Sequence, residues 1–266
     1  MAIRTTIITA THFALAVIAG CGGDSGPKAG DRPARTTEAA DAPSAEQPLL
    51  EGGERVVFIG DSLAVEAPPN YPELLPDALG GRAPEVETVN LAEPGTTASD
   101  WRPGSELFSQ RLVPELGSAD LVVVTLGGND LQEGLGASDG LDGLSSGSGS
   151  SGDALGAIDS FGRQLSRIFV AIRRRAPDAR IVYVGYPDYS EATAWQQAAG
   201  SLGIVALRFG LSSLLEAAGE AEPDLLIDMG PATARAGVDA MLADSEHLST
   251  AGHELYARRL GAELTR

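Results

Sequence analysis

Short runs of apolar residues, bounded by glycine or polar residues, recur along the chain from residue 55 onward. Such runs are typical of strands buried on both faces of a sheet. We predict five strands: Arg55–Gly60, Val86–Leu91, Leu121–Leu126, Arg180–Gly185 and Ile204–Leu207. Between them lie segments with helical spacing, the clearest of which contains Ile158, Phe161, Leu165, Ile168, Phe169 and Ile172. This alternation predicts an α/β protein, a three-layer α/β/α sandwich with a parallel sheet of about five strands, whose active groups follow the carboxyl ends of the strands.

One stretch interrupts the alternation of strands and helices. Residues 134–156 consist almost wholly of Gly, Ser, Asp and Leu, which predicts a flexible loop. Within this stretch, Gly147–Gly152 matches the G-x-G-x-x-G pattern of dinucleotide-binding loops. Because no predicted strand ends just before it, we interpret the match as a coincidence of low-complexity composition.

The amino-terminal region differs in composition from the rest. Residues 1–20 contain one charge, Arg4, and an apolar stretch too short to span a bilayer comfortably, which predicts an export signal. The sequence Ile-Ala-Gly-Cys that ends at Cys21 resembles the lipobox of bacterial lipoproteins. The resemblance implies a lipid on Cys21 and an extracytoplasmic protein anchored to a membrane of the cell envelope. A buried cysteine in an uncleaved or differently cleaved signal is the alternative.

Domain boundaries follow from the same composition. Residues 21–53 are rich in Gly, Pro, Ala, Ser and acidic residues, and we predict a disordered tether there because few apolar groups are available to offset the entropy of ordering. Residues 54–266 form the predicted folded domain.

Charge and cysteine content exclude several classes of function. The chain has 37 acidic and 19 basic residues, a formal charge of -18. Such a surface repels phosphate backbones, so we predict no nucleic acid partner. The single cysteine excludes an intramolecular disulfide and a multi-thiolate metal centre.

Four polar blocks occur in order along the predicted domain. They are Gly60-Asp-Ser-Leu63, Asn90-Leu-Ala-Glu-Pro-Gly95, Gly127-Gly-Asn-Asp130 and Asp244-Ser-Glu-His247. In order and placement, the blocks resemble the signature of the SGNH, or GDSL-type, hydrolase family, and the resemblance covers residues 55–266. It implies a flavodoxin-like fold and an esterase with a serine nucleophile that needs no metal or organic cofactor.

The first and last blocks contain the residue types that acyl transfer requires. A serine hydroxyl becomes a good nucleophile when a histidine removes its proton and a third group orients the ring. The predicted mature chain contains two histidines, His247 and His253. Asp244 lies three positions before His247, whereas Thr250 has that offset from His253, which falls in a predicted final helix. We therefore predict Ser62 as nucleophile, His247 as base and Asp244 as the group that orients it.

The resemblance also implies an oxyanion hole. Its donors are the backbone N–H groups of Ser62 and Gly95 and the side-chain amide of Asn129, which would stabilise the negative oxygen formed during ester cleavage. Taken singly, each residue has a simpler interpretation: a helix cap for Ser62, a turn glycine, a loop amide, and a surface histidine for His247. We expect Asp61 to hold the turn through its carboxylate without a catalytic step.

Substrate class is less directly indicated. Candidates for the pocket lining, each equally compatible with ordinary packing, are Leu63, Trp101, Leu131, Tyr186 and Pro187. The composition of residues 134–156 argues against a large fixed lipid groove. We therefore predict a small or medium carboxylic ester, such as a short acyl ester or an acetylated envelope glycan.

Three other functions fit parts of the pattern. The same acyl-enzyme would transfer its acyl group to a sugar hydroxyl in an acyltransferase. A noncatalytic, carbohydrate-binding lipoprotein would keep the fold alone. Metal-assisted hydrolysis through Asp61, Asp130, Asp244 and His247 is less favoured because the two histidines lack a recognisable zinc spacing. The sequence predicts neither the oligomeric state nor the destination membrane.

Overall fold

The computed structural model describes residues 48–136 and 151–266. The predicted export signal, Cys21, the tether as far as residue 47 and residues 137–150 of the predicted loop lie outside the described residues. Predictions on those segments therefore stay predictions. In the described ranges, no helix is both long enough and apolar enough to cross a membrane.

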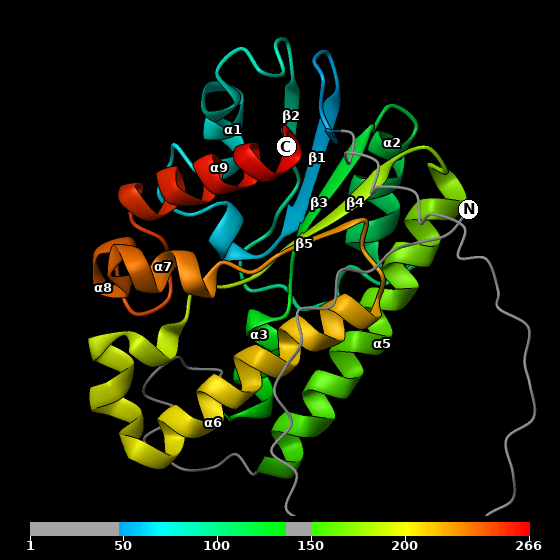
Figure 1. The fold of residues 1–266 in the computed structure, drawn as a ribbon. Helices are drawn as coiled ribbons and strands as arrows, with labels where there is room; N and C mark the ends of the chain where they lie inside the picture. The colour runs from blue at the N-terminus through cyan, green and yellow to red at the C-terminus, as the bar shows by residue number, and fades with distance from the viewer. Residues whose placement is uncertain (1–47, 137–150) are drawn as a thin grey trace, which may run out of the picture. The chain divides into compact units, whose positions relative to one another are not determined.

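The centre of the fold is a parallel sheet of five strands in the order β2-β1-β3-β4-β5 (Figure 1). The strands are β1 (Arg55–Gly60), β2 (Glu87–Asn90), β3 (Leu121–Thr125), β4 (Arg180–Val184) and β5 (Leu225–Ile227). The first four agree with predicted strands to within one residue at each end. The prediction of a three-layer, flavodoxin-like α/β sandwich is confirmed.

The fifth predicted strand, Ile204–Leu207, is wrong, because these residues lie within the long helix α6 (Thr193–Glu220). Leu207 is buried whereas Val205 is 66% exposed, as expected when one face of a helix packs inward. The true fifth strand, Leu225–Ile227, was not predicted. It has only three residues, and Leu226 is exposed at the sheet edge, so it lacks the long apolar run of a central strand.

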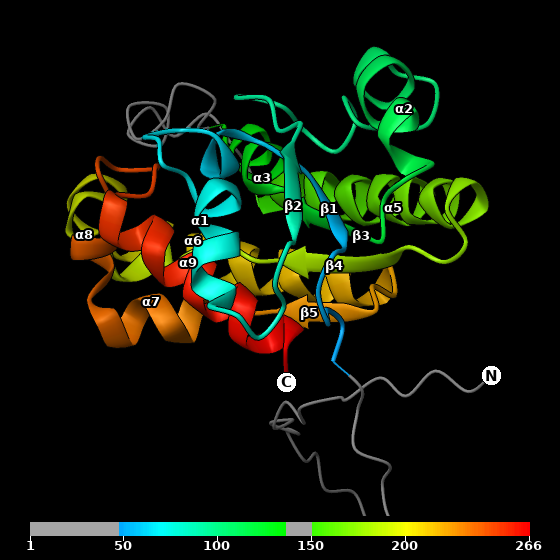
Figure 2. The same cartoon turned by 90° about the horizontal axis from the view of Figure 1, so that it is seen from above.

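Helices cover both faces of the sheet (Figures 1 and 2). Helices α1 and α9 lie on one face, with α7 and α8 packed against α9, and α3, α5 and α6 lie on the other. The remaining bounds are α1 (Tyr71–Leu79), α2 (Val113–Leu116), α3 (Gly128–Gly134), α5 (Ser151–Arg175), α7 (Gly230–Ala236), α8 (Val238–Met241) and α9 (Thr250–Leu264), with single-turn helices at Ser62–Ala64 and Tyr189–Glu191 and a π-helical segment at Leu107–Leu112.

Two predicted boundaries are corrected by the structure. The helix predicted around Ile158–Ile172 is α5, but it begins at Ser151, so the last six residues of the predicted 134–156 loop are helical. The folded body also begins before residue 54. Leu50 is buried, and the backbone N–H groups of Leu49 and Leu50 both donate to the carbonyl oxygen of Leu264. Burial of this side chain removes apolar surface from water, which offsets the ordering of the segment.

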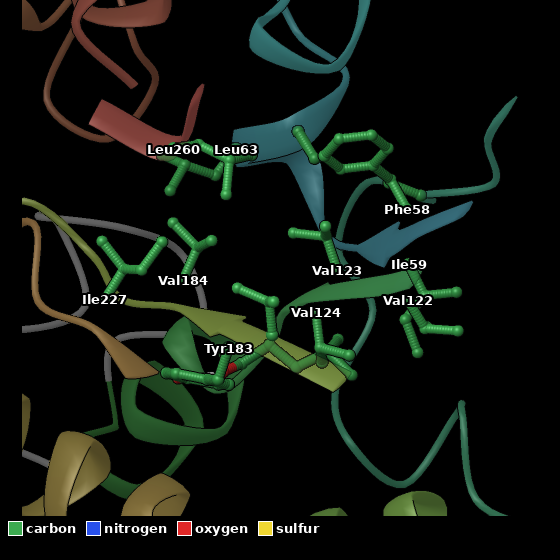
Figure 3. Close-up of a cluster of buried hydrophobic side chains, with 14 of the residues drawn as sticks. Phe58, Ile59, Leu63, Val122, Val123, Val124, Tyr183, Val184, Ile227 and Leu260 are labelled. Carbon is green, nitrogen blue, oxygen red and sulfur yellow. Dashed lines mark hydrogen bonds between the residues drawn. The ribbon is translucent and has the colours of Figure 1, made fainter. Parts of the chain in front are cut away.

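A continuous hydrophobic core fixes the position of the strand ends. All five residues of β3 are buried, and their side chains pack against those of β1, β4 and the surrounding helices (Figure 3). At its carboxyl end β1 closely approaches β3, since a Cβ atom on Gly60 would lie 2.6 Å from the Thr125 carbonyl oxygen. Only glycine fits there, and the loops that follow the two strands therefore begin close to each other.

Candidate active site

The candidate site lies where the strand order reverses. Strand β1 lies between β2 and β3 in the sheet. The connections that follow β1 and β3 therefore pass to opposite faces of the sheet, which leaves a crevice between them at the carboxyl ends of the two strands. Ser62 follows β1, and Asn129 follows β3. Both line the same small pocket, whose volume is about 40 Å³. The structure thus brings together the first and third sequence blocks.

The turn that carries Ser62 is held by Asp61. The Asp61 N–H donates to the Thr125 carbonyl oxygen at 3.2 Å, and Asp61 Oδ1 accepts from the Leu63 N–H at 3.0 Å. This is a helix N-cap, and it starts the single turn Ser62–Ala64. The expectation that Asp61 ties down the turn is confirmed. The Ser62 side chain makes no hydrogen bond within the described ranges.

Asp61 is also a buried charge beside the site. Burial raises the pKa of its carboxyl to about 6, although hydrogen bonds from Tyr186 and the Leu63 N–H and the charge of His247 act in the opposite direction. The Tyr186 hydroxyl donates to Asp61 Oδ2 at 2.5 Å. A Cβ atom on Gly128 would lie 2.7 Å from the Tyr186 ring, so glycine at this position makes room for that ring. The sequence identified Tyr186 as a pocket residue but not as the partner of Asp61.

Two of the three predicted oxyanion donors, Ser62 and Asn129, line the same pocket, and the third, Gly95, lies in a loop that is hydrogen-bonded to Asn129 and to the end of β1. The Asn129 side-chain amide donates one hydrogen to the carbonyl oxygen of Thr96 at 2.8 Å, which leaves its second N–H available. Thr96 follows Gly95, which has a φ of 76°. The Thr96 hydroxyl in turn lies 3.1 Å from the Gly60 carbonyl oxygen, just before the Ser62 turn. Within the described ranges, the Gly95 and Ser62 N–H groups have no protein acceptor.

The predicted base lies in the loop between α8 and α9. Asp244 Oδ2 and His247 Nδ1 are 2.8 Å apart, and Asp244 Oδ1 accepts the backbone N–H groups of Glu246 and His247. An antiparallel bridge between Leu242 and Leu248 closes the base of the loop. Asp244 therefore holds both the loop and the imidazole ring, and it directs the other ring nitrogen, Nε2, away from itself.

Asp244 and His247 shift each other's pKa in the directions that stabilise an ion pair. Partial burial alone would lower the pKa of His247, but the hydrogen bond and charge of Asp244, with Glu66 and Glu246, outweigh it and raise that pKa above its ordinary value. Partial burial would raise the pKa of Asp244, but hydrogen bonds from His247 and from backbone N–H groups lower it. The charged form of the imidazole is thus stabilised once it accepts a proton.

Two aromatic side chains that the sequence did not indicate fix this loop. The Tyr189 hydroxyl donates to the Glu246 carbonyl oxygen at 2.7 Å, and Trp195 Nε1 donates to the Ser245 carbonyl oxygen at 2.6 Å. The two rings lie 5.9 Å apart and line the Ser62 pocket. Because both acceptors are backbone carbonyls, no sequence motif marks them. Tyr189 and Trp195 hold the His247 loop against the pocket.

We expect Trp195→Phe to lower kcat/KM about three- to tenfold, because the Ser245 carbonyl loses its donor and the His247 loop loses one support. A net hydrogen bond contributes about 1 kcal/mol, which is about fivefold in a rate. Steady-state kinetics on a chromogenic acetate ester would measure the loss, with thermal unfolding as the check on folding. Tyr189→Phe is the matched variant for the other support. Unchanged kcat/KM in both variants would contradict this role.

His247 lies close enough to the pocket to act on Asp61 electrostatically, and its neighbour Glu246 lines the pocket with Ser62. No hydrogen bond joins the Ser62 hydroxyl to the imidazole within the described ranges. Such bonds are often long in free enzymes and shorten with substrate. His253 is instead fully buried in α9, where its Nδ1 accepts the Tyr71 N–H at 3.2 Å and burial lowers its pKa.

The other candidate residues divide between the site and its surroundings. Leu63, Leu131 and Tyr186 line the Ser62 pocket, and Pro187 lines a neighbouring cleft. Trp101 is fully buried and donates to the Thr96 hydroxyl at 3.0 Å, so it supports the loop that contains Gly95 and Thr96.

The four residues considered for metal-assisted hydrolysis do not form a metal-binding group. Among the described residues, no group of three or more His, Cys, Asp or Glu side chains is arranged to hold a metal ion. Asp61 binds Tyr186 and the Leu63 N–H, and Asp130 Oδ2 accepts the Ala98 N–H at 3.0 Å.

A pH dependence follows from the His247 environment. If the neutral imidazole is the base, activity requires that His247 lose its proton, and its raised pKa places that step above 6.5. We expect kcat/KM to rise with pH through an apparent pKa above 6.5. Rates measured between pH 5 and pH 9 on an ester without a titrating group would test this. An acid limb centred well below pH 6 would contradict it.

The fold and the order of the blocks define a serine hydrolase of the SGNH type that hydrolyses esters. The GDSL-like lipase/acylhydrolase family model matches residues 58–255, and the chain belongs to that family. No curated protein matches the sequence.

Solved structures agree on the fold. An extracellular lipase from Streptomyces rimosus is 20% identical with a TM-score of 0.57, covering 79% of this chain and 99% of that one. Phospholipase A1 from Streptomyces albidoflavus NA297 is 19% identical with a TM-score of 0.58, covering 80% of this chain and 100% of that one. At these identities the likeness concerns the fold.

Proposed function

We propose that the protein is an extracytoplasmic serine esterase that hydrolyses small or medium carboxylic esters through an acyl-enzyme. The observation that carries the proposal is the convergence on one crevice: Ser62 and Asn129 share a pocket, and the Asp244–His247 pair lies in a loop held at its rim. A noncatalytic binding protein has no need for this arrangement.

In the proposed reaction Ser62 Oγ attacks the ester carbonyl carbon while His247 Nε2 removes the hydroxyl proton. The C=O electron pair moves to oxygen, and the resulting oxyanion accepts hydrogen bonds from the Ser62 and Gly95 N–H groups and the free Asn129 N–H. Collapse of this intermediate breaks the bond to the alcohol oxygen, which takes the proton from His247. Water then attacks the acyl-serine with the same proton transfers and releases the acid.

The dimensions of the pocket support a short acyl group. Its volume is about 40 Å³, and many of its lining residues are apolar: Leu63, Leu131, Leu135, Leu207 and Leu211. Leu131 is fixed from behind, since a Cβ on Gly210 of α6 would lie 2.6 Å from Leu131 Cδ1. An acetyl or similarly short group matches such a space, and an acetylated envelope glycan is one source of it.

Localisation is the second part of the proposal. The sequence of residues 1–21 supports export and attachment of a lipid to Cys21, and attached acyl chains hold a protein at a membrane surface. We expect the full chain, expressed in a bacterial host, to partition into detergent, and Cys21→Ala to partition into the aqueous phase. Mass spectrometry of the mature amino terminus would identify the modification. An unmodified Cys21 would refute this part.

A panel of esters tests the chemical part. Purified full-length protein would be assayed with p-nitrophenyl acetate, butyrate, octanoate and palmitate and with a long-chain phospholipid, beside the Ser62→Ala variant. We expect acetate and butyrate to be cleaved fastest. A strong preference for phospholipid would refute the substrate class, and absence of all hydrolysis would refute the esterase. Product analysis with glycan acceptors distinguishes hydrolysis from acyl transfer.

A further inference from the structure

A second and larger cavity lies beside the Ser62 pocket. It occupies about 270 Å³ outside the carboxyl ends of β4 and β5, between α6 and the start of α7. We define it as the β4–β5 cleft, lined among others by Tyr186, Asp188, Arg208, Ser212, Asp228 and Ala234. Because all strands are parallel, the cleft opens at the same edge of the sheet as Ser62.

The cleft and the Ser62 pocket share a wall. Tyr186 and Leu211 line both cavities. The Tyr186 hydroxyl points to Asp61, next to the nucleophile, while its ring forms part of the cleft. A substrate whose acyl group fills the small pocket therefore has the larger cleft next to it for its other half, the alcohol.

Two carboxylates in the cleft, those of Asp188 and Asp228, are each held in place by hydrogen bonds to one of their two oxygen atoms. Asp188 Oδ1 accepts the backbone N–H and the hydroxyl of Ser190, and Asp228 Oδ1 accepts the Gly230 N–H. In the described part of the chain, Asp188 Oδ2 and Asp228 Oδ2 have no hydrogen-bond partner. The two carboxylates flank Gly230, whose Cβ position is 3.2 Å from Asp228 Oδ1 and 3.7 Å from the Asp188 Cβ. Fixed carboxylate oxygens are strong acceptors for hydroxyl donors.

The remaining walls of the cleft are partly apolar and include one ion pair. The Tyr186 ring, Pro231 and Ala234 offer apolar surface against which the C–H face of a sugar ring packs. Arg208 is a positive charge in the same cleft, with its guanidinium bound to Ser190 and Glu191. Because Glu191 neutralises Arg208, Asp188 and Asp228 set the charge of the cleft, and a cationic alcohol such as choline is the competing ligand.

We propose that the β4–β5 cleft binds the alcohol half of the substrate and that this alcohol is polyhydroxylated, a sugar whose hydroxyls donate to Asp188 and Asp228. The inference rests on the proposed esterase function and makes the substrate an acetylated or similarly acylated sugar. Ser62 supplies the chemistry and the cleft supplies the selectivity for the leaving group.

Three acetates with the same acyl group and different alcohols distinguish the proposed esterase activity of Ser62 from the proposed binding of a sugar in the cleft. These are p-nitrophenyl acetate, a mono-O-acetylated hexose and acetylcholine. Asp228→Asn keeps the shape and a possible acceptor for the Gly230 N–H but removes the charge, and Ala234→Trp places a ring in the cleft from an exposed position of α7. We avoid Asp188, because it caps the single turn Tyr189–Glu191 that carries Tyr189. Glu216→Gln, an exposed change on α6 outside the cleft, is the control.

We expect Asp228→Asn to raise KM for the sugar acetate about tenfold or more and to leave kcat/KM for p-nitrophenyl acetate, whose aryl alcohol has no further hydroxyl to donate, within twofold of the parent. Ala234→Trp should raise KM for the sugar acetate by a clearly larger factor than KM for p-nitrophenyl acetate. Glu216→Gln should leave both esters unchanged. Equal effects on all three esters, or none, would overturn the inference. A preference for acetylcholine that Asp228→Asn abolishes would also overturn it, in favour of a cationic alcohol. If the parent protein cleaves none of the three, the proposed esterase function itself fails.

Discussion

Replacement of Ser62 by alanine is expected to lower kcat for ester hydrolysis about 10⁵- to 10⁶-fold, the size of loss seen when an enzyme loses a covalent nucleophile. A loss of this size is expected because every bond change in the proposed reaction begins at the Ser62 oxygen. Removal of the hydroxyl costs the fold little, since the side chain makes no hydrogen bond within the described ranges. A stopped assay with acetate ester at high enzyme concentration would measure the residual rate.

The matched control is Ser118→Ala. Ser118 is an exposed serine before β3, at the opposite end of that strand from the crevice. It should retain full activity and the same melting temperature as the parent. A Ser62→Ala protein that folds and keeps more than a few per cent of parental kcat would show that another group is the nucleophile.

Replacement of Asp244 by asparagine is expected to lower kcat about 10³- to 10⁴-fold, as when the carboxylate of a catalytic triad is replaced by an amide. Asparagine keeps the size of the side chain but removes the charge that stabilises the protonated imidazole. Since the hydrogen bond and charge of Asp244 raise the pKa of His247, their loss lowers that pKa. The acid limb of the residual activity should therefore move to lower pH.

The pH profile distinguishes this role from a structural one. A merely looser loop would lower the rate without moving the acid limb. Glu254→Gln, which removes an exposed carboxylate in the following helix α9, is the control and should leave both rate and profile unchanged. An Asp244→Asn variant that keeps the parental acid limb would mean that the titrating group is not His247.

The sequence predicted the parts of the fold that have a strong local pattern. Strands β1 and β3 are buried along nearly their whole length, and such strands need continuous apolar runs. Strand β5 is short and lies at an edge, and the apolar run at Ile204–Leu207 serves a helix instead. For runs this short, apolar content alone does not separate a strand from one face of a helix.

The candidate site was predictable to the extent that residues follow strands. In a parallel sheet the order of blocks along the chain places Ser62 and Asn129 at one edge, and the short spacing from Asp244 to His247 permits their contact. The supports of the site were not predictable. Tyr189 and Trp195 bind backbone carbonyls some fifty residues away, contacts that only the three-dimensional fold creates.

The same limit applies to the electrostatics of the site. Nothing local in the sequence indicates that Asp61 is buried or that Tyr186, 125 positions later, donates to it. Burial within the core raises the pKa of Asp61, and the hydrogen bond from that one hydroxyl acts against the rise. The β4–β5 cleft likewise combines residues of α6 and α7 with the ends of two strands.

The role of Ser62 as the activated nucleophile is tested most directly by mass spectrometry of the intact protein after treatment with a fluorophosphonate, which phosphonylates only a serine that a neighbouring base activates. We expect one adduct per chain, mapped to the peptide that contains Ser62, absent from Ser62→Ala and strongly slowed in His247→Ala. Rapid labelling of a different residue, or no labelling of folded protein that still cleaves acetate esters, would contradict it.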